Sequence, residues 1–356
     1  MDIKIEHNKN LKVKPDQSNL GFGKYFTDHM FIMDYKNGAW CDARIIPYAP
    51  LELDPAVMVL HYGQAVFEGL KCYRAKGGGL NLFRPEKNFE RLNKSDERLC
   101  IPQLDVDFAI KSLKELIKID ESWVPSEPGT SLYIRPFVIA TEIGVGVHPS
   151  SEYMFIIILS PVGAYYKEGL NPVKICIENE YVRAVRGGIG FTKATANYAS
   201  SLKGQEKAKG LGYSQVLWLD GVERKYIEEV GTMNVFFKIG GEVITPELNG
   251  SILPGITRDS VIEMLRVHGI KVVERKIAVS EIFEAAREGK LEEAFGTGTA
   301  AVISPIGEFS MGGEKVSINN GKIGSLSQKL YDNLTGVQYG AIEDHFNWIT
   351  TIDMHV

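Results

Sequence analysis

The sequence has few of the residues that form disulfides, metal sites or membrane spans. Its 356 residues include four cysteines, and none of these belongs to a Cys-x-x-Cys pair. A disulfide framework or a zinc knuckle is therefore not expected, and we predict no metal ligand set. The longest strongly apolar run, around 154–159, is far shorter than the ~20 residues that a membrane helix needs. The cysteines are Cys41, Cys72, Cys100 and Cys176.

An excess of charge of one sign is also missing. Lys and Arg total 40 against 45 Asp and Glu, which gives a formal net charge of −5. A dedicated nucleic-acid binder would show a basic surplus or stripe, and the sequence has neither. The first residues, MDIKIEHNKN, have no apolar stretch behind their charges, so we expect no secretory signal. These absences predict a cytoplasmic protein with neither nucleic acid nor membrane as a partner.

The composition that is present is typical of a folded globular protein. Hydrophobic residues make up 44% and charged residues 24% of the chain. The length predicts two domains, because a domain usually has about 100–200 residues. A polar, glycine-containing stretch at 163–171 lies near mid-chain, and we place the interdomain linker there. The predicted domains are a smaller N-terminal one, residues 1–162, and a larger C-terminal one, residues 172–356.

The local patterns alternate antiparallel hairpins with attached helices, which favours an α+β fold over a doubly wound parallel sheet. Helical spacing of apolar residues predicts helices over 85–100, 108–117, 194–209 and 257–268. Runs rich in β-branched and aromatic residues predict strands over 131–140 and 152–162. Turn residues predict hairpins that reverse at 36–38, 220–221 and 240–241.

A single lysine, Lys193, follows three glycines in the segment RGGIGFTKATANYASS, residues 186–201. Glycines let the backbone turn tightly, and a lysine held after such a turn is presented into a cleft. Loss of hydration there favours the neutral amine, which forms Schiff bases with carbonyl groups. The alternative interpretation is a surface lysine beside a packing loop.

Two acids, Glu228 and Glu229, stand at the start of an apolar strand in IEEVGTMNVFF. Neighbouring strand residues face opposite sides of a sheet, so one acid should be solvated and the other should face what the sheet covers. An acid that faces a cleft can hold a protonated ring nitrogen, as a pyridoxal cofactor requires. An ordinary solvated edge carboxylate is the alternative.

Two glycine-containing loops carry hydroxyl groups. In SILPGITRDS, residues 251–260, Thr257 is the expected helix N-cap, and the amides near Ile256 and Thr257 would be donors at the positive helix end. The second loop, FGTGTAAV at residues 295–302, is too short for a P-loop. Arg91 is either a phosphate ligand or a solvated helix arginine. Plain turns are the alternative for both loops.

Together and in this order, these segments resemble the branched-chain amino acid aminotransferases, which belong to the fold-type IV pyridoxal phosphate enzymes. The resemblance covers nearly the whole chain. One such motif would be weak, but eight in the family's order are very specific. The matching stretches are FGKYFTDHM, HYGQAVFEGLKCYR, FRPEKNFERL, SLYIRP, GGIGFTKATANYA, EEVGTMNVFF, LPGITRDS and FGTGTAAVISP.

The resemblance implies a role for each matching residue. Lys193 matches the catalytic lysine, which forms the internal aldimine with pyridoxal 5′-phosphate and later moves a proton. Glu229 matches the partner of the pyridine nitrogen, which leaves Glu228 as the solvated neighbour. Tyr198 matches the tyrosine that hydrogen-bonds the phenolic oxygen of the cofactor. The implied phosphate ligands are Arg91, Ile256, Thr257 and Thr299, and the implied substrate-binding residues are Phe22, Tyr62, Phe67, Tyr133, Arg135, Thr299 and Ala300.

The resemblance also implies an activity, a fold and an assembly. The activity is reversible transfer of the amino group between L-leucine, L-isoleucine or L-valine and 2-oxoglutarate. The fold is the two-domain α+β architecture of fold-type IV, similar to the D-amino-acid aminotransferases. The assembly is a homodimer in which a partner loop, around 144–149, completes each site. Some members carry a Cys-x-x-Cys where this chain has Ala301 and Ser304, so no thiol switch is expected there.

Two other functions are compatible with parts of this pattern. An aminodeoxychorismate lyase or a D-amino-acid aminotransferase would keep the cofactor and the fold. Such relatives are typically shorter, and they would not be expected to share SLYIRP and HYGQAVFEGLKCYR so fully. A protein that kept the scaffold without the cofactor is disfavoured, because Lys193, Tyr198, Glu229 and Arg91 are all present.

Overall fold

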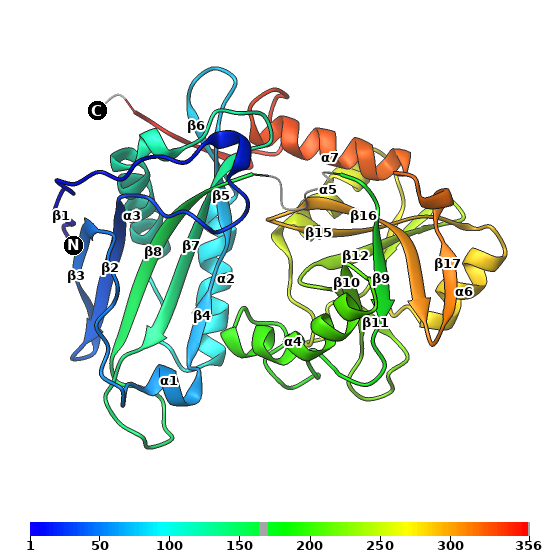
Figure 1. Ribbon diagram of the computed structural model, residues 1–356, viewed down its shortest axis with the longest axis horizontal. Helices are drawn as coiled ribbons and strands as arrows, with labels where there is room; N and C mark the ends of the chain where they lie inside the picture. Colours follow the sequence, from blue (N-terminus) through cyan, green and yellow to red (C-terminus); the bar gives the residue numbers. More distant parts are fainter. Residues whose placement is uncertain (164–169, 355–356) are drawn as a thin grey trace. The chain divides into compact units, whose positions relative to one another are not determined.

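The computed structural model describes residues 1–163 and 170–354, which form two compact units (Figure 1). The first unit takes in residues 1–163, 192–195 and 336–354, and the second takes in 170–191 and 196–335. The predicted linker at 163–171 lies largely outside the described residues. The domain bounds 1–162 and 172–356 stay a prediction, whereas the first unit is assembled from three separate stretches of the chain.

The first unit is built on a sheet whose strands are antiparallel except where β1 joins β3. In the described part of the chain the strand order is β1-β3-β2-β8-β7-β5-β6-β18, and β4 also pairs with β7. The C-terminal strand β18 thus closes one edge of a sheet that begins near the N-terminus. The strands are β1 (Lys4–Ile5), β2 (His29–Lys36), β3 (Ala39–Pro47), β4 (Ala65–Phe67), β5 (Leu70–Arg74), β6 (Leu80–Phe83), β7 (Ser131–Ala140), β8 (Tyr153–Val162) and β18 (Ile349–Ile352).

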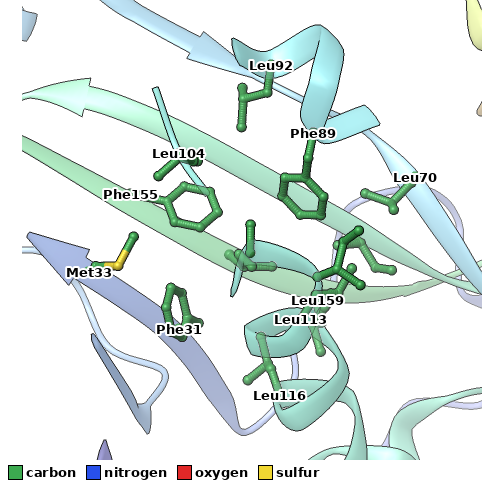
Figure 2. Packing of buried hydrophobic residues seen from close by; sticks show 14 of the residues in the cluster. Phe31, Met33, Leu70, Phe89, Leu92, Leu104, Leu113, Leu116, Phe155 and Leu159 are labelled. Carbon is green, nitrogen blue, oxygen red and sulfur yellow. The ribbon is translucent and has the colours of Figure 1, made fainter. Parts of the chain in front are cut away.

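Helices cover one face of this sheet and supply much of its core (Figure 2). Phe89 and Leu92 come from α2, and Leu113 and Leu116 from α3; all four are buried with Phe155 of β8. Burial of each such side chain contributes about 1.5–3 kcal/mol. The helices predicted over 85–100 and 108–117 are thereby confirmed. The helical segments are α1 (Met58–Tyr62), α2 (Pro85–Arg98), α3 (Val106–Ile119) and the 3₁₀ turns Gln17–Asn19 and Glu121–Trp123.

The second unit has a mixed sheet with helices α4, α5 and α6. Its strand order, within the described residues, is β11-β10-β9-β16-β15-β12-β13-β14, with β17 paired to β16. Its strands are β9 (Val173–Ile177), β10 (Gln215–Leu219), β11 (Ile227–Val230), β12 (Asn234–Ile239), β13 (Glu242–Thr245), β14 (Val272–Glu274), β15 (Leu291–Gly298), β16 (Val302–Met311) and β17 (Glu314–Ser317). Its helices are α4 (Thr195–Gly210), α5 (Ile256–Val267), α6 (Val279–Arg287), the 3₁₀ turn Asn319–Gly321 and most of α7 (Ser325–Gln338).

Two of the three predicted hairpin turns are confirmed by the structure, and the third is not. The β2–β3 hairpin reverses at Asn37 and Gly38, whose φ values of 53° and 80° suit a two-residue turn between twisted strands. The β12–β13 hairpin reverses at Gly240–Gly241 in the same way. The prediction of a two-residue turn at 220–221 is wrong, because the loop continues to Tyr226. The Asp220 carboxylate organises that longer loop by accepting four backbone N–H groups.

All four cysteines are free thiols. Burial raises the pKa of Cys72 to about 12, so this thiol stays protonated at neutral pH. Among the described residues, no helix combines the length and apolar character that crossing a bilayer requires. The same residues contain no group of three or more His, Cys, Asp or Glu side chains placed to hold a metal ion.

Candidate active site

Lys193 belongs to a short segment that packs onto the first unit. Its backbone N–H donates to Ser95 Oγ of α2 at 2.9 Å, and its carbonyl accepts the N–H of Phe67 at 3.1 Å. The next residue, Ala194, forms an isolated β-bridge with Val66 of β4. These contacts fix the backbone on both sides of the lysine. Its side-chain nitrogen, Nζ, lies 5.0 Å from the centre of the Phe67 ring.

A buried ion pair joins α2 to the strand beside this lysine. Arg91 donates from Nε to Glu68 Oε1 at 2.7 Å and from Nη2 to Oε2 at 2.9 Å. Asn88 donates to the same carboxylate at 2.7 Å. Burial alone would raise the pKa of Glu68, but Arg91, assisted by Lys193 and Asn88, holds that pKa below its usual value. Glu68 is therefore an ionised carboxylate that orients Arg91.

A second buried acid, Asp96 of α2, has the opposite electrostatic setting from Glu68. Asp96 follows the serine that holds Lys193, and neither of its carboxylate oxygens has a hydrogen-bond partner among the described residues. Burial raises the pKa of Asp96 well above its usual value. Its carboxyl group therefore keeps its proton to a higher pH than an ordinary aspartate does.

Aromatic rings and one arginine line the same face of the first sheet. Phe22 packs edge-on against Tyr133, with ring centres 4.9 Å apart. Arg135 donates to the Tyr133 hydroxyl at 3.1 Å and lies 4.6 Å above the Phe67 ring. The hydroxyl of Tyr133 sits over Gly69, where any larger residue would clash with it. The structure thus brings four of the predicted substrate-binding residues together with Lys193.

Tyr62, another predicted substrate-binding residue, lies at the end of α1. Its hydroxyl donates to the carbonyl of Val145 in the loop between β7 and β8. Apolar side chains are unusually exposed around this contact: they are Leu60, Ile143, Val145 and Val147. A cluster of exposed aliphatic residues on one loop and one short helix is typical of a protein–protein contact.

In the second unit, Glu229 is held by groups that favour its charged form. Its Oε1 accepts the N–H of Leu253 at 2.7 Å and lies 3.3 Å from the guanidinium of Arg183. Arg183 is itself buried and donates to the carbonyls of Gly190 and Ser251. The carboxylate is therefore fixed beside the segment that leads into α5.

The expectation that Glu228 is solvated is wrong. Glu228 is 2% exposed and Glu229 is 3% exposed. In the pairing of β11 with β10, Glu229 lies opposite Trp218 and Ile227 lies opposite Leu219, so Glu228 falls at a bulge that interrupts the alternation of faces. Glu228 is covered because Ser251 and Asn249 both donate to its Oε1. The segment that contains Asn249 and Ser251 covers Glu228. The local sequence around Glu228 does not predict this cover.

Helix α5 begins one residue earlier than the sequence suggested. The N-cap is Gly255, with φ −70° and ψ 133°, and it makes no side-chain cap. Ile256 and Thr257 are the first two helical residues, so the N-cap assigned to Thr257 is wrong. Their N–H groups have no acceptor within the helix, because the first turn of any α-helix lacks one. They still form the positive end that an anion would occupy.

Two side chains connect this helix start to β15. Asn234 donates to the carbonyl of Leu253 at 2.9 Å and lies so close to Gly255 that a side chain there would clash. Thr297 of β15 is paired with Asn234, and its buried hydroxyl has no partner among the described residues. A buried, unpaired hydroxyl beside a helix N-terminus is suited to an anion such as phosphate.

Two of the remaining predicted residues of the second unit lie close to Thr297 in the chain. Thr299 and Ala300 form the turn between β15 and β16, and Val302 closes it with φ +61°. A β-branched residue rarely adopts this conformation, which costs about 1–3 kcal/mol and is often found at functional loops. Tyr198 lies half-buried in the first turns of α4.

Two further charged residues, Glu68 and Arg183, hold groups of the site although no sequence motif assigns them a role. Glu68 fixes Arg91, and Arg183 holds Glu229. A charged residue inside the apolar strand sequence AVFEGLKC was the one available signal for Glu68. No comparable signal marks Arg183, because its partner Glu229 lies 46 positions later in the chain.

Comparison with known proteins places these groups in context. Residues 65–309 match the family model described as amino-transferase class IV. The chain is 60% identical over 351 residues to branched-chain-amino-acid aminotransferase 2 of Bacillus subtilis. The aligned region covers 98% of this chain and 97% of that protein. Its fold matches the crystal structure of the Escherichia coli branched-chain amino acid aminotransferase, with a TM-score of 0.76, 27% identity and coverage of 92% and 99%. It also matches the holo-form, with pyridoxal phosphate, of the Thermobaculum terrenum branched-chain aminotransferase, with a TM-score of 0.73, 26% identity and coverage of 91% and 98%.

Proposed function

Because the chain belongs to the class IV aminotransferases, we propose that it is a pyridoxal phosphate-dependent branched-chain-amino-acid aminotransferase. The reaction moves an amino group reversibly between L-leucine, L-isoleucine or L-valine and 2-oxoglutarate. The observation that carries this proposal is the grouping of Lys193, Phe67, Tyr133 and Arg135 on one face of the first unit. We also propose that the protein acts in the cytoplasm.

The available groups fit pyridoxal 5′-phosphate. The cofactor needs an amine for its aldehyde, an anion for its ring nitrogen and donors for its phosphate. Lys193 supplies the amine, and the Glu229 carboxylate beside Arg183 supplies the anion. Ile256 and Thr257 offer amide donors beside the unpaired hydroxyl of Thr297. Arg91, Thr299 and Tyr198 are the proposed further ligands.

When bound, the cofactor supplies an electron sink for charge that develops at the substrate α-carbon. The chain's own residues do the rest. The Lys193 amine takes the α-proton and returns it, as a positioned general base and acid. Glu229 would keep the proton on the ring nitrogen, because Leu253 and Arg183 hold its carboxylate in place. Tyr198 would donate a hydrogen bond to the cofactor's phenolic oxygen.

The substrate wall meets two demands at once. Phe22 and Phe67 present apolar surface to a branched side chain, while Arg135 and the Tyr133 hydroxyl can bind a carboxylate. The same pocket can therefore accept both leucine and the glutamate/2-oxoglutarate pair. Discrimination among the three branched substrates is expected to be shallow, since one methylene is worth only about 1–3 kcal/mol.

We propose that the assembly is a homodimer. The loop predicted to reach a partner's site, 144–149, carries Val145 and Val147, and Val147 is 84% exposed. A solvent-facing valine at this position is stabilised when a second copy of the chain covers it. Thr299 and Ala300 are proposed as further substrate-binding residues.

The visible absorption of the purified protein tests the catalytic proposal. L-Leucine added without a keto acid should shift the cofactor band to shorter wavelength, and transamination of leucine should be measurable. Lys193→Ala should lower the rate at least about a thousandfold, because both the amine and the proton transfer are lost. Lys203→Ala, at an exposed position of α4, is the matched control and should keep the rate.

Two results would contradict the proposal. A Lys193→Ala variant that still transaminates leucine would remove the mechanism. A band that shifts with D-alanine but not with L-leucine would favour a D-amino-acid aminotransferase instead.

A further inference from the structure

The second unit contains a hollow that none of the proposed catalytic residues lines. Its volume is about 610 Å³, including space open to solvent. It lies between the loop that follows β10, the start of β11 and the segment that follows β13. The polar residues that face it include Arg186, Tyr226, Glu228, Glu247, Asn249 and Lys276.

Glu228 is the most informative residue of this hollow. Its Oε1 accepts hydrogen bonds from Ser251 and Asn249, whereas its Oε2 has no partner among the described residues. A buried carboxylate oxygen without a donor is energetically unfavourable, because it has lost its hydration and gained no hydrogen bond in return. A ligand that brings a charged N–H donor would satisfy it and would be attracted by the charge.

The other charged residues define what such a ligand must carry. Arg186 and Lys276 are exposed at the hollow and form no ion pair with the described residues. Both match a carboxylate well. Asp220 also lines the hollow, but its oxygens are already occupied by four backbone N–H groups. The Asp220 carboxylate therefore stabilises the loop and is not counted among the groups that bind the ligand.

A metal ion does not fit these residues. The described residues hold no group of three His, Cys, Asp or Glu side chains arranged as ligands. The hollow instead combines the buried acceptor Glu228 with the cations Arg186 and Lys276. The carboxylates of Glu223 and Glu247 line it as well, with apolar surface from Val222, Pro246 and Ile252. We propose that this hollow binds a small zwitterion, an α-amino acid with a short side chain. The ammonium group meets Glu228, and the carboxylate meets Lys276 and Arg186.

Contacts within the unit link this hollow to Glu229. Ser251 donates from its hydroxyl to Glu228 and accepts Arg183 at its carbonyl, and Arg183 lies 3.3 Å from Glu229. Occupancy of the hollow therefore shifts the visible band of the bound cofactor. This link to the cofactor rests on the proposed function, whereas binding itself does not.

Binding is measured with the full chain loaded with pyridoxamine 5′-phosphate, whose amine cannot react with an amino acid. Isothermal titration with individual α-amino acids, glycine through leucine, should show saturable binding of at least one. Glu228→Gln removes the charge and keeps the shape, and Lys276→Ala removes the exposed cation. Each should weaken binding at least tenfold, which corresponds to about 1.4 kcal/mol. Glu314→Gln, which does not line the hollow, is the control and should bind as the parent does.

Three outcomes would overturn the inference. The first is the absence of saturable binding by any amino acid tested. The second is binding that neither Glu228→Gln nor Lys276→Ala weakens. The third is equal binding of the amino acid and its amide, because the carboxylate would then have no role. A protein that binds the amino acid but fails to transaminate leucine would refute the proposed function and leave the hollow's assignment standing. Binding that leaves the cofactor band unchanged would refute the link to Glu229.

Discussion

Replacement of Glu68 by glutamine is expected to destabilise the first unit strongly. The change keeps the shape of the side chain but leaves the buried Arg91 guanidinium without its carboxylate. Breaking one side of a buried ion pair typically costs about 3–5 kcal/mol. Urea unfolding of the cofactor-free protein, followed by tryptophan fluorescence, should show this loss at pH 7.5.

The pH dependence gives the same experiment a second readout. Since the folded protein lowers the pKa of Glu68 below 4.5, its contribution is present above pH 4.5 and is lost as pH falls through the lowered value. The difference between parent and Glu68→Gln should therefore shrink in acid. It should not shrink between pH 6 and pH 8, where Glu68 remains ionised.

A matched control is available on the same helix. Glu90 forms an exposed pair with Lys87 at 2.8 Å, and such pairs are worth about 0–1 kcal/mol. Glu90→Gln should therefore change stability by no more than that. If Glu68→Gln costs as little as Glu90→Gln, the buried pair does not organise α2, and the reasoning about Arg91 fails.

Two further predictions concern other parts of the first unit. Asp96→Asn should stabilise the protein at neutral pH, because burial raises the pKa of Asp96 and its ionisation in the folded state therefore costs free energy that an amide does not. The stability that protonated Asp96 contributes is complete below pH 3.8 and is lost as the pH rises through its raised pKa. The gain in unfolding free energy from Asp96→Asn, measured by urea unfolding, should therefore be smaller at pH 4 than at neutral pH. An equal gain at pH 4 and at neutral pH would contradict this. Val147→Lys should weaken the proposed dimer at least about tenfold in sedimentation velocity, because a charge would be buried at the contact. Val13→Lys, at an exposed position of the N-terminal arm, should leave the mass unchanged, and a Val147→Lys protein that associates as tightly as the parent would refute the loop's role.

The fold class and the order of local elements were predictable because their signals are local. Apolar spacing defined α2 and α3 within two residues, and Asn37–Gly38 defined a turn that requires positive φ. The family motifs added the two-domain α+β architecture, which matches solved structures of branched-chain aminotransferases. Local pattern and motif therefore agree wherever the determining residues are close in sequence.

The features that were missed depend on residues distant in sequence. Glu228 was expected in solvent because its cover, Asn249 and Ser251, lies more than twenty positions away. The N-cap of α5 was assigned to Thr257 because a threonine caps well, whereas Gly255 takes the position with no side chain at all. The roles of the predicted site residues remain predictions, and the experiments above address them.

The strand β18 has a consequence for how the protein is made. It pairs with β6 from Ile349 opposite Phe83 to Ile352 opposite Leu80, so the first sheet takes its edge from the last part of the chain. Translation delivers this strand only after the entire second unit has been synthesised. Until then β6 presents an open edge, which is prone to pair with other chains. A nascent chain stalled after residue 335 would therefore be aggregation-prone, although it already carries Lys193 and every other proposed catalytic group.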